Sequence, residues 1–76
     1  MLGQPKYQYG DIVRFNCIGE IRTGTIAIVD RYGTFANPHD VSYDILNKGE
    51  NMLYKHVPEQ DVIEKIGEGE KPFAPY

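Results

Sequence analysis

A thiol and two imidazoles are the side chains in this 76-residue sequence best suited to covalent chemistry. Cys17 with His39 or His56 would supply a nucleophile and a base. No third residue to orient the base, and no oxyanion-binding element, stands at a recognisable spacing. Free cysteine is also commonly buried. We therefore expect Cys17 to be a small core residue and assign no catalytic residue.

Metal ligands and catalytic carboxylates are not grouped. His39 and Asp40 directly follow an Asn-Pro pair, which is typical of a turn. The 11 Asp and Glu residues are scattered, without the apolar surroundings that raise the pKa of a catalytic carboxylate. The glycines are too dispersed to form a phosphate-binding loop. We expect no enzymatic activity, no metal and no cofactor.

Aromatic and cationic side chains form the candidate partner-binding set. Arg31, Tyr32 and Phe35 share one turn-rich segment, whereas Tyr54 and His56 stand two residues apart in an extended one. Such groups can stack on bases or enclose a cationic side chain. The alternative is that the aromatic rings close the open ends of a small β-structure. Both interpretations stay open at the level of sequence.

Short runs with period-two alternation predict β-strands at residues 12–18, 25–29, 42–46, 52–57 and 62–66. Gly24 marks a point where a strand bends or another backbone comes close. Residues 30–40 are the longest expected loop, and 47–51 form a hairpin loop in which Gly49 would take a positive φ. Pro58 ends one strand and, with the residues after it, favours a single helical turn before the last strand.

Inward-facing positions on these strands predict the core. They are Val13, Phe15, Ile26, Ile28, Tyr43, Ile45, Leu53, Val57 and Val62. A bulge near Ala27 would instead bring Val29 inward. If Leu53 and Val57 face the core, alternation places Tyr54 and His56 on the solvent side.

The order of these signals resembles an SH3-like barrel. The segments that carry the resemblance are Gly10–Phe15, Gly24–Ile26, Ser42–Ile45, Leu53–Tyr54 and Val57–Val62. The chain is similar to small barrels of the KOW and Tudor kind, and resembles uncharacterised small proteins of Gram-positive bacteria and their mobile elements. The resemblance implies an all-β, five-stranded SH3-like barrel with one short helical turn before the last strand.

The resemblance covers the middle of the chain, and the composition of the two ends separates an arm and a tail from it. Residues 1–8 would be an N-terminal arm, whose tyrosine would fold back onto the domain, 9–66 the barrel, and 67–76 a flexible C-terminal tail. With one cysteine and no signal-like or membrane-spanning apolar run, the protein is expected to be cytoplasmic and to contact no membrane.

A formal net charge of −3 argues against a large phosphate-binding surface. The favoured function is a noncatalytic binding module with a protein partner. The alternative is a KOW-like, nucleic-acid-associated accessory protein with weak affinity. Its candidate contacts are Arg14, Arg22, Arg31, Lys48 and Lys55.

Overall fold

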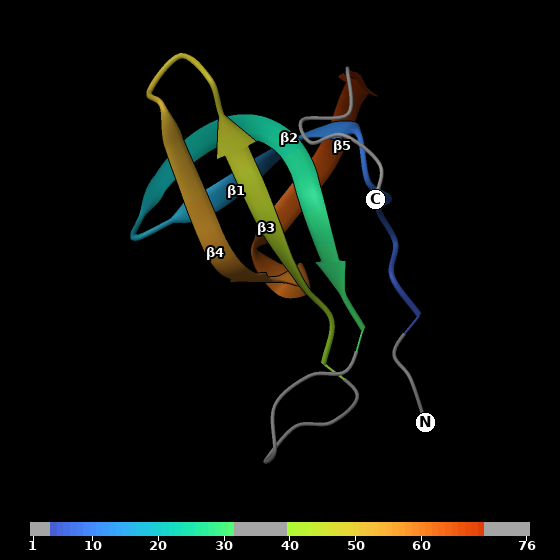
Figure 1. Ribbon diagram of the computed structural model, residues 1–76. Helices are drawn as coiled ribbons and strands as arrows, with labels where there is room; N and C mark the ends of the chain where they lie inside the picture. Colours follow the sequence, from blue (N-terminus) through green and yellow to red (C-terminus); the bar gives the residue numbers. More distant parts are fainter. Residues whose placement is uncertain (1–3, 32–39, 70–76) are drawn as a thin grey trace.

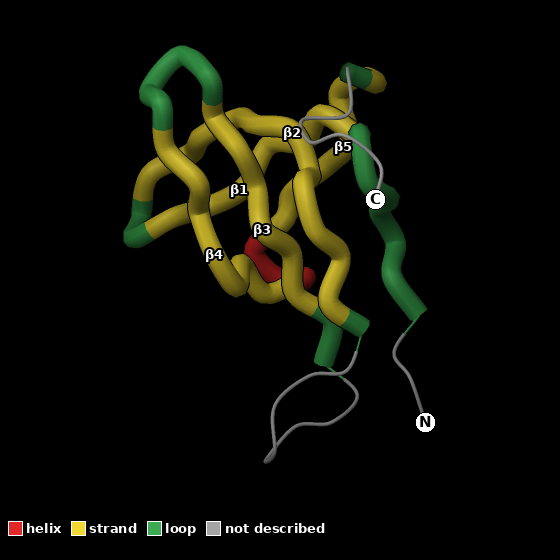
Figure 2. Tube along the Cα trace, viewed as in Figure 1, coloured by secondary structure: helices red, strands yellow, loops and turns green. Residues whose placement is uncertain are grey.

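The computed structural model describes residues 4–31 and 40–69, which contain one five-stranded antiparallel sheet (Figure 1). The strands are β1 (Asp11–Cys17), β2 (Glu20–Asp30), β3 (Ser42–Asn47), β4 (Met52–Pro58) and β5 (Val62–Glu68). One turn of 3-10 helix, η1 (Glu59–Asp61), joins β4 to β5 (Figure 2). The all-β class, the five strands and the helical turn before the last strand are confirmed.

The long strand β2 gives the sheet its curvature. Its first half pairs with β1 and its second half with β3, and the strand bends strongly between them (Figure 1). A Cβ atom on Gly24 would lie 2.6 Å from Ile45 Cγ2 and 2.8 Å from the Leu46 carbonyl oxygen. The expected close approach of another backbone at Gly24 is therefore confirmed.

The strand order is β4-β3-β2-β1-β5, so β1 lies between the second and fifth strands. The two outer strands, β4 and β5, do not pair with each other in the described part of the chain. The sheet is thus curled, but no ladder of hydrogen bonds joins its two outer strands. In the described part of the chain it is therefore not closed into a barrel.

The core lies on the concave face of the curled sheet. It comprises Val13, Phe15, Ile26, Val41, Tyr43, Ile45, Val57 and Val62. The expected core positions of β1 and β3 are confirmed, whereas Ile28 is 47% exposed and that prediction is wrong. A bulge between Ile26 and Ile28 shifts the register against β3, buries Ala27 and lets Val29 pack against the core, as the bulged alternative predicts.

A second bulge redirects the side chains of β4. Ile45 pairs with Tyr54 and Tyr43 pairs with Val57, so two β4 residues stand opposite one β3 residue. One of those two, His56, adopts φ +57°, a left-handed conformation. Such an extra residue breaks the inward and outward alternation of a strand.

This bulge overturns two expectations about β4. Leu53 is half-buried and outside the core cluster, while Tyr54 packs against that cluster instead of facing solvent. Val57 is buried and His56 is exposed, as expected. Strict alternation predicted the wrong face for Tyr54 because it counted no extra residue between Tyr54 and Val57.

The hairpin turns also differ in detail from the sequence interpretation. Ile18 and Gly19, with φ of +50° and +78°, form the tight turn between β1 and β2. In the turn between β3 and β4 the residue with positive φ is Asn51, at +54°, and not Gly49. Asparagine tolerates this conformation better than most residues, because its short polar side chain can hydrogen-bond locally.

The last strand is longer than expected. β5 continues to Glu68, and the Gly69 N–H donates to the Gly10 carbonyl oxygen at 2.8 Å. Gly67 and Glu68, assigned by the sequence to the tail, therefore belong to the sheet. The rest of that predicted tail, residues 70–76, lies outside the described residues. Within the described ranges, no helix is long and apolar enough to cross a membrane.

Candidate functional site

The N-terminal residues 4–9, called the strap below, pack against the sheet without adding a strand to it (Figure 1). The Lys6 backbone N–H donates to Glu59 Oε2 at 3.0 Å, and the Tyr7 backbone N–H donates to the Tyr43 hydroxyl at 3.3 Å. The Tyr7 ring meets the Tyr43 ring edge to face, with the centroids 5.9 Å apart. The expected return of an N-terminal tyrosine onto the domain is confirmed for Tyr7.

Glu59 connects the strap to the sheet. Its Oε2 also accepts a hydrogen bond from the Tyr43 hydroxyl at 2.6 Å, and its backbone N–H donates to the Val41 carbonyl oxygen at 3.0 Å. Burial, followed by the hydrogen bond to Glu59, raises the pKa of Tyr43. The phenol therefore stays protonated and acts as a donor toward the Glu59 carboxylate.

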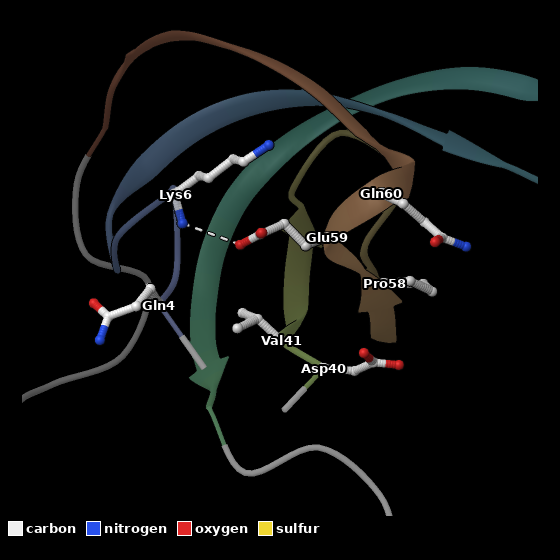
Figure 3. Close-up of a pocket in the computed structure, with 7 residues that line it drawn as sticks. All are labelled: Gln4, Lys6, Asp40, Val41, Pro58, Glu59 and Gln60. Carbon is white, nitrogen blue, oxygen red and sulfur yellow. Dashed lines mark hydrogen bonds between the residues drawn. The ribbon is translucent and has the colours of Figure 1, made fainter. Parts of the chain in front are cut away.

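A pocket of about 430 Å³ lies beside this junction (Figure 3). It is lined by Gln4, Lys6, Asp40, Val41, Pro58, Glu59 and Gln60. These residues come from three segments: the strap, the two residues before β3, and the passage from β4 into η1. The pocket is within the size range of ligand sites in proteins, about 300 to 1,000 Å³.

The lining combines hydrogen-bond acceptors with a small apolar surface. Asp40 and Glu59 contribute carboxylates, two glutamines contribute amides, and Val41 and Pro58 contribute the apolar part. The Lys6 ammonium and the Asp40 carboxylate lie at opposite ends of the pocket (Figure 3). With two carboxylates and one ammonium, the formal charge of the lining is 1 − 2 = −1. Neither a thiol nor an imidazole is among the lining side chains.

The groups considered for catalysis lie elsewhere. Cys17 is partly buried and packs against the core, at the end of β1. His56 is exposed in the β4 bulge, where its backbone N–H donates to Asp44 Oδ1 at 3.0 Å. Among the described residues, no group of three or more His, Cys, Asp or Glu is placed to hold a metal ion.

The structure describes three of the five predicted partner-binding residues, Arg31, Tyr54 and His56. Tyr54 packs edge to face against Phe15, with centroids 5.3 Å apart, whereas His56 is exposed. Arg31 is exposed just after β2. Tyr32 and Phe35 lie outside the described residues. The Tyr54 ring is thus better described as part of the packing around the core than as an exposed binding surface.

Arg22 is held by carboxylates and by the Tyr54 ring. Its guanidinium lies 2.6 Å from Glu50, 2.5 Å from Glu20 and 5.6 Å from the centroid of Tyr54, whose hydroxyl donates to Glu50 Oε1 at 2.8 Å. Burial lowers the pKa of Arg22, but the surrounding negative groups, Glu50 first, outweigh it, and the net pKa is raised. This cluster fastens the start of β2 to the turn between β3 and β4.

Two of the five candidate nucleic-acid contacts are therefore paired with carboxylates within the chain. Arg14 lies 2.9 Å from Glu64 across β1 and β5, and Arg22 is paired as described. The other three, Arg31, Lys48 and Lys55, are exposed. They come from three different segments, the end of β2, the β3–β4 turn and the bulge of β4.

Sequence reasoning missed the pocket because its walls are distant along the chain. Pro58 and Glu59 were identified as the start of a turn, which is correct. The hydrogen bond between Lys6 and Glu59 spans 53 positions, and no local pattern encodes it. The one local signal that could have pointed there is the Glu59 carboxylate, directly after a strand-ending proline.

No protein-family model, curated protein or solved structure matches this chain. The assignment of a function therefore depends on the geometry of the described residues.

Proposed function

We propose that the protein is a noncatalytic binding module that holds a segment of a partner protein in the pocket beside η1, at the junction of the strap and the sheet. The observation that carries this proposal is the pocket itself, about 430 Å³ in volume and bounded by three chain segments. Acceptors and apolar groups at its surface suit a polypeptide, which offers backbone N–H donors and side chains together.

The strand order and the single 3-10 turn before β5 support an SH3-like barrel of the KOW or Tudor kind as the finer description of this fold. Small barrels of this kind serve many unrelated functions, so the fold does not select a partner. We therefore choose between a protein and a nucleic acid by the net charge of the chain and by the chemistry of the pocket lining.

A protein partner fits the charge of the molecule better than a nucleic acid does. The chain carries a net charge of −3, and the pocket lining is itself negative. Nucleic-acid affinity depends on clustered cations that neutralise phosphates. Arg14 and Arg22 pair with carboxylates, and so does Lys65, which lies 3.4 Å from Asp11.

The test is a selection of random peptides on the immobilised full-length protein, followed by mapping of the bound peptides through backbone amide shifts. The largest shifts are expected at Val41, Glu59 and Gln60. Asp40→Asn should weaken binding because it replaces a charged acceptor of the pocket by a neutral amide. Glu68→Gln is the matched control: it removes one negative charge from a carboxylate that is 81% exposed on β5, and binding should persist.

Two results would reject the proposal. One is a set of selected peptides whose shifts map away from the pocket and ignore Asp40→Asn. The other is an absence of peptide binding together with salt-sensitive shifts at Lys48 and Lys55 on addition of single-stranded RNA or DNA, which would favour the nucleic-acid alternative.

A further inference from the structure

The strap already makes the kind of contacts that a bound peptide would make. Two successive backbone N–H groups, those of Lys6 and Tyr7, donate to Glu59 Oε2 and to the Tyr43 hydroxyl. The Tyr7 ring adds an edge-to-face contact with Tyr43. We infer that the strap occupies, in the free chain, the seat on Glu59 and Tyr43 that adjoins the pocket, and that the partner displaces it with a bent segment that carries an aromatic residue.

This inference rests on the proposed function and gives the chemistry of the partner. Lys6 and Tyr7 stand in a bend, and their successive N–H groups converge on Glu59 Oε2 and the Tyr43 hydroxyl oxygen, which lie 2.6 Å apart. These two acceptors therefore recognise a bent main chain with two free N–H groups. The aromatic position supplies the selectivity, since edge-to-face pairs contribute beyond their buried area. The partner segment is thus predicted to bend at two successive residues, neither of them proline, with an aromatic side chain at the second.

The groups that receive the strap are positioned independently of it. Tyr43 is fully buried within β3, and the Glu59 backbone is tied to Val41 by a hydrogen bond of 3.0 Å. When the strap leaves, the carboxylate and the phenol stay in place for another segment. Because such a site is already ordered, little free energy is spent on ordering it when a partner binds.

A hinge stands where the strap joins the sheet. Gln8 and Asp11 form a reciprocal turn: the Gln8 N–H donates to Asp11 Oδ2 at 2.9 Å, and the Asp11 N–H donates to the Gln8 carbonyl oxygen at 3.0 Å. Gly10 adopts φ +93°, which favours glycine, and its N–H donates to the Ile26 carbonyl oxygen. Residues before Gln8 can leave Glu59 and Tyr43 while this turn holds the rest of the chain in the sheet.

The experiment exchanges the strap for a peptide in trans, using the full-length chain. Tyr7→Ala removes the ring that anchors the strap, and the probe is a capped peptide of residues 4–9, Gln-Pro-Lys-Tyr-Gln-Tyr. The peptide is expected to give saturable amide shifts at Val41, Tyr43 and Glu59 of the variant. The wild-type chain should need at least about tenfold more peptide, because its tethered strap competes at a high effective concentration.

Two modified peptides separate specific binding from nonspecific contact. A peptide in which alanine replaces its first tyrosine should lose most of its affinity, because the ring contact is missing. A peptide methylated on the backbone nitrogens of its Lys and first Tyr keeps every side chain but lacks both N–H donors, and it should bind at least about tenfold more weakly.

Equal binding of the peptide to both chains, full binding of the methylated peptide, or no binding to the Tyr7→Ala chain would overturn the inference. Hydrogen exchange on the wild-type chain gives a second readout that needs no variant. Lys6 and Tyr7 amides should exchange faster than the Gly10 amide, and they should lose protection when a selected partner peptide binds. Partner binding with Lys6 and Tyr7 still protected would reject the strap exchange and leave the proposed function intact.

Discussion

Glu59 is the residue on which the site depends, because one of its oxygens connects three parts of the chain. Oε2 accepts hydrogen bonds from the Tyr43 hydroxyl in β3 and from the Lys6 backbone in the strap, while Glu59 itself belongs to η1. Hydrogen bonds to charged groups contribute about 1.5 to 3 kcal/mol, roughly twice the contribution of neutral ones. A single carboxylate thus sets the position of the strap relative to the pocket.

Tyr43→Phe should lower the free energy of unfolding by about 1 to 3 kcal/mol at neutral pH, because it leaves Glu59 without its phenolic donor and the Tyr7 N–H without its acceptor. Urea denaturation followed by circular dichroism measures the change. A variant as stable as the wild type would show that solvent replaces these hydrogen bonds at no cost.

The raised pKa of Tyr43 also predicts how stability depends on pH. The native state keeps its proton above the ordinary tyrosine pKa of about 10, where the unfolded chain loses it. The native state then binds more protons, so the stabilisation is complete below pH ~10 and is lost as the pH rises further. Tyr43→Phe should flatten this decline without abolishing it, because the raised pKa values of Tyr54 and Lys65 act in the same direction. Denaturation midpoints at pH 8, 10 and 11 test the prediction, and identical slopes for the two chains would contradict it.

Ile18 is an unfavourable residue for its place in the first hairpin. It is β-branched, has φ +50° and is 98% exposed. Ile18→Asn should raise the free energy of unfolding by about 1 kcal/mol, since asparagine suits a left-handed turn position. Thermal unfolding measures the effect. Ile21→Asn is the matched control, at an exposed site within β2, and should not stabilise; a lower melting temperature for Ile18→Asn would contradict the argument.

At the scale of the elements, bulges decide which side chains reach the core. The bulge after Ile26 admits Val29 and expels Ile28, and the bulge before Val57 turns Tyr54 inward. At Gly24 the curved strand β2 lies so close to β3 that a Cβ atom on this residue would collide with β3. The shape of the concave face is therefore set by these local departures from regular strands.

Gly24→Ala should destabilise the protein by about 1 to 3 kcal/mol, the usual effect of overpacking, because the new methyl group would lie 2.8 Å from the Leu46 carbonyl oxygen. Gly49→Ala is the control, because its Cβ would meet Asn47 Oδ1 at 3.4 Å without a positive φ, and it should be close to neutral. Urea midpoints of the two variants give the comparison. Equal midpoints would show that the sheet opens at Gly24 without cost.

Elements that depend on local pattern were predictable from sequence. Alternation correctly placed Val13 and Phe15 inside, and Pro58 correctly marked the change from strand to helical turn. The bulges were not fixed by alternation, because a strand with one extra residue has the same composition as a regular one. The strap and the pocket were missed because their hydrogen bonds join residues at opposite ends of the chain.

At the scale of the whole molecule, the open edges of the sheet are poorly suited to pairing with another strand. β4 carries a bulge, Lys55 and a terminal proline, and β5 is shifted in register against β1 at two places. Bulges, prolines and lysines on edge strands discourage pairing with other chains. Binding through the pocket is then favoured over addition of a strand at either edge.

The central claim is that a partner segment lies in the pocket beside η1, against Val41 and Pro58. Intermolecular NOEs between the ¹³C-labelled protein and an unlabelled selected peptide test it most directly. We predict NOEs from the peptide to the Val41 methyl groups and the Pro58 ring, the apolar part of the lining. NOEs confined to exposed apolar side chains elsewhere, such as Ile21, Met52 or Ile66, would contradict the claim and place the binding surface on another face.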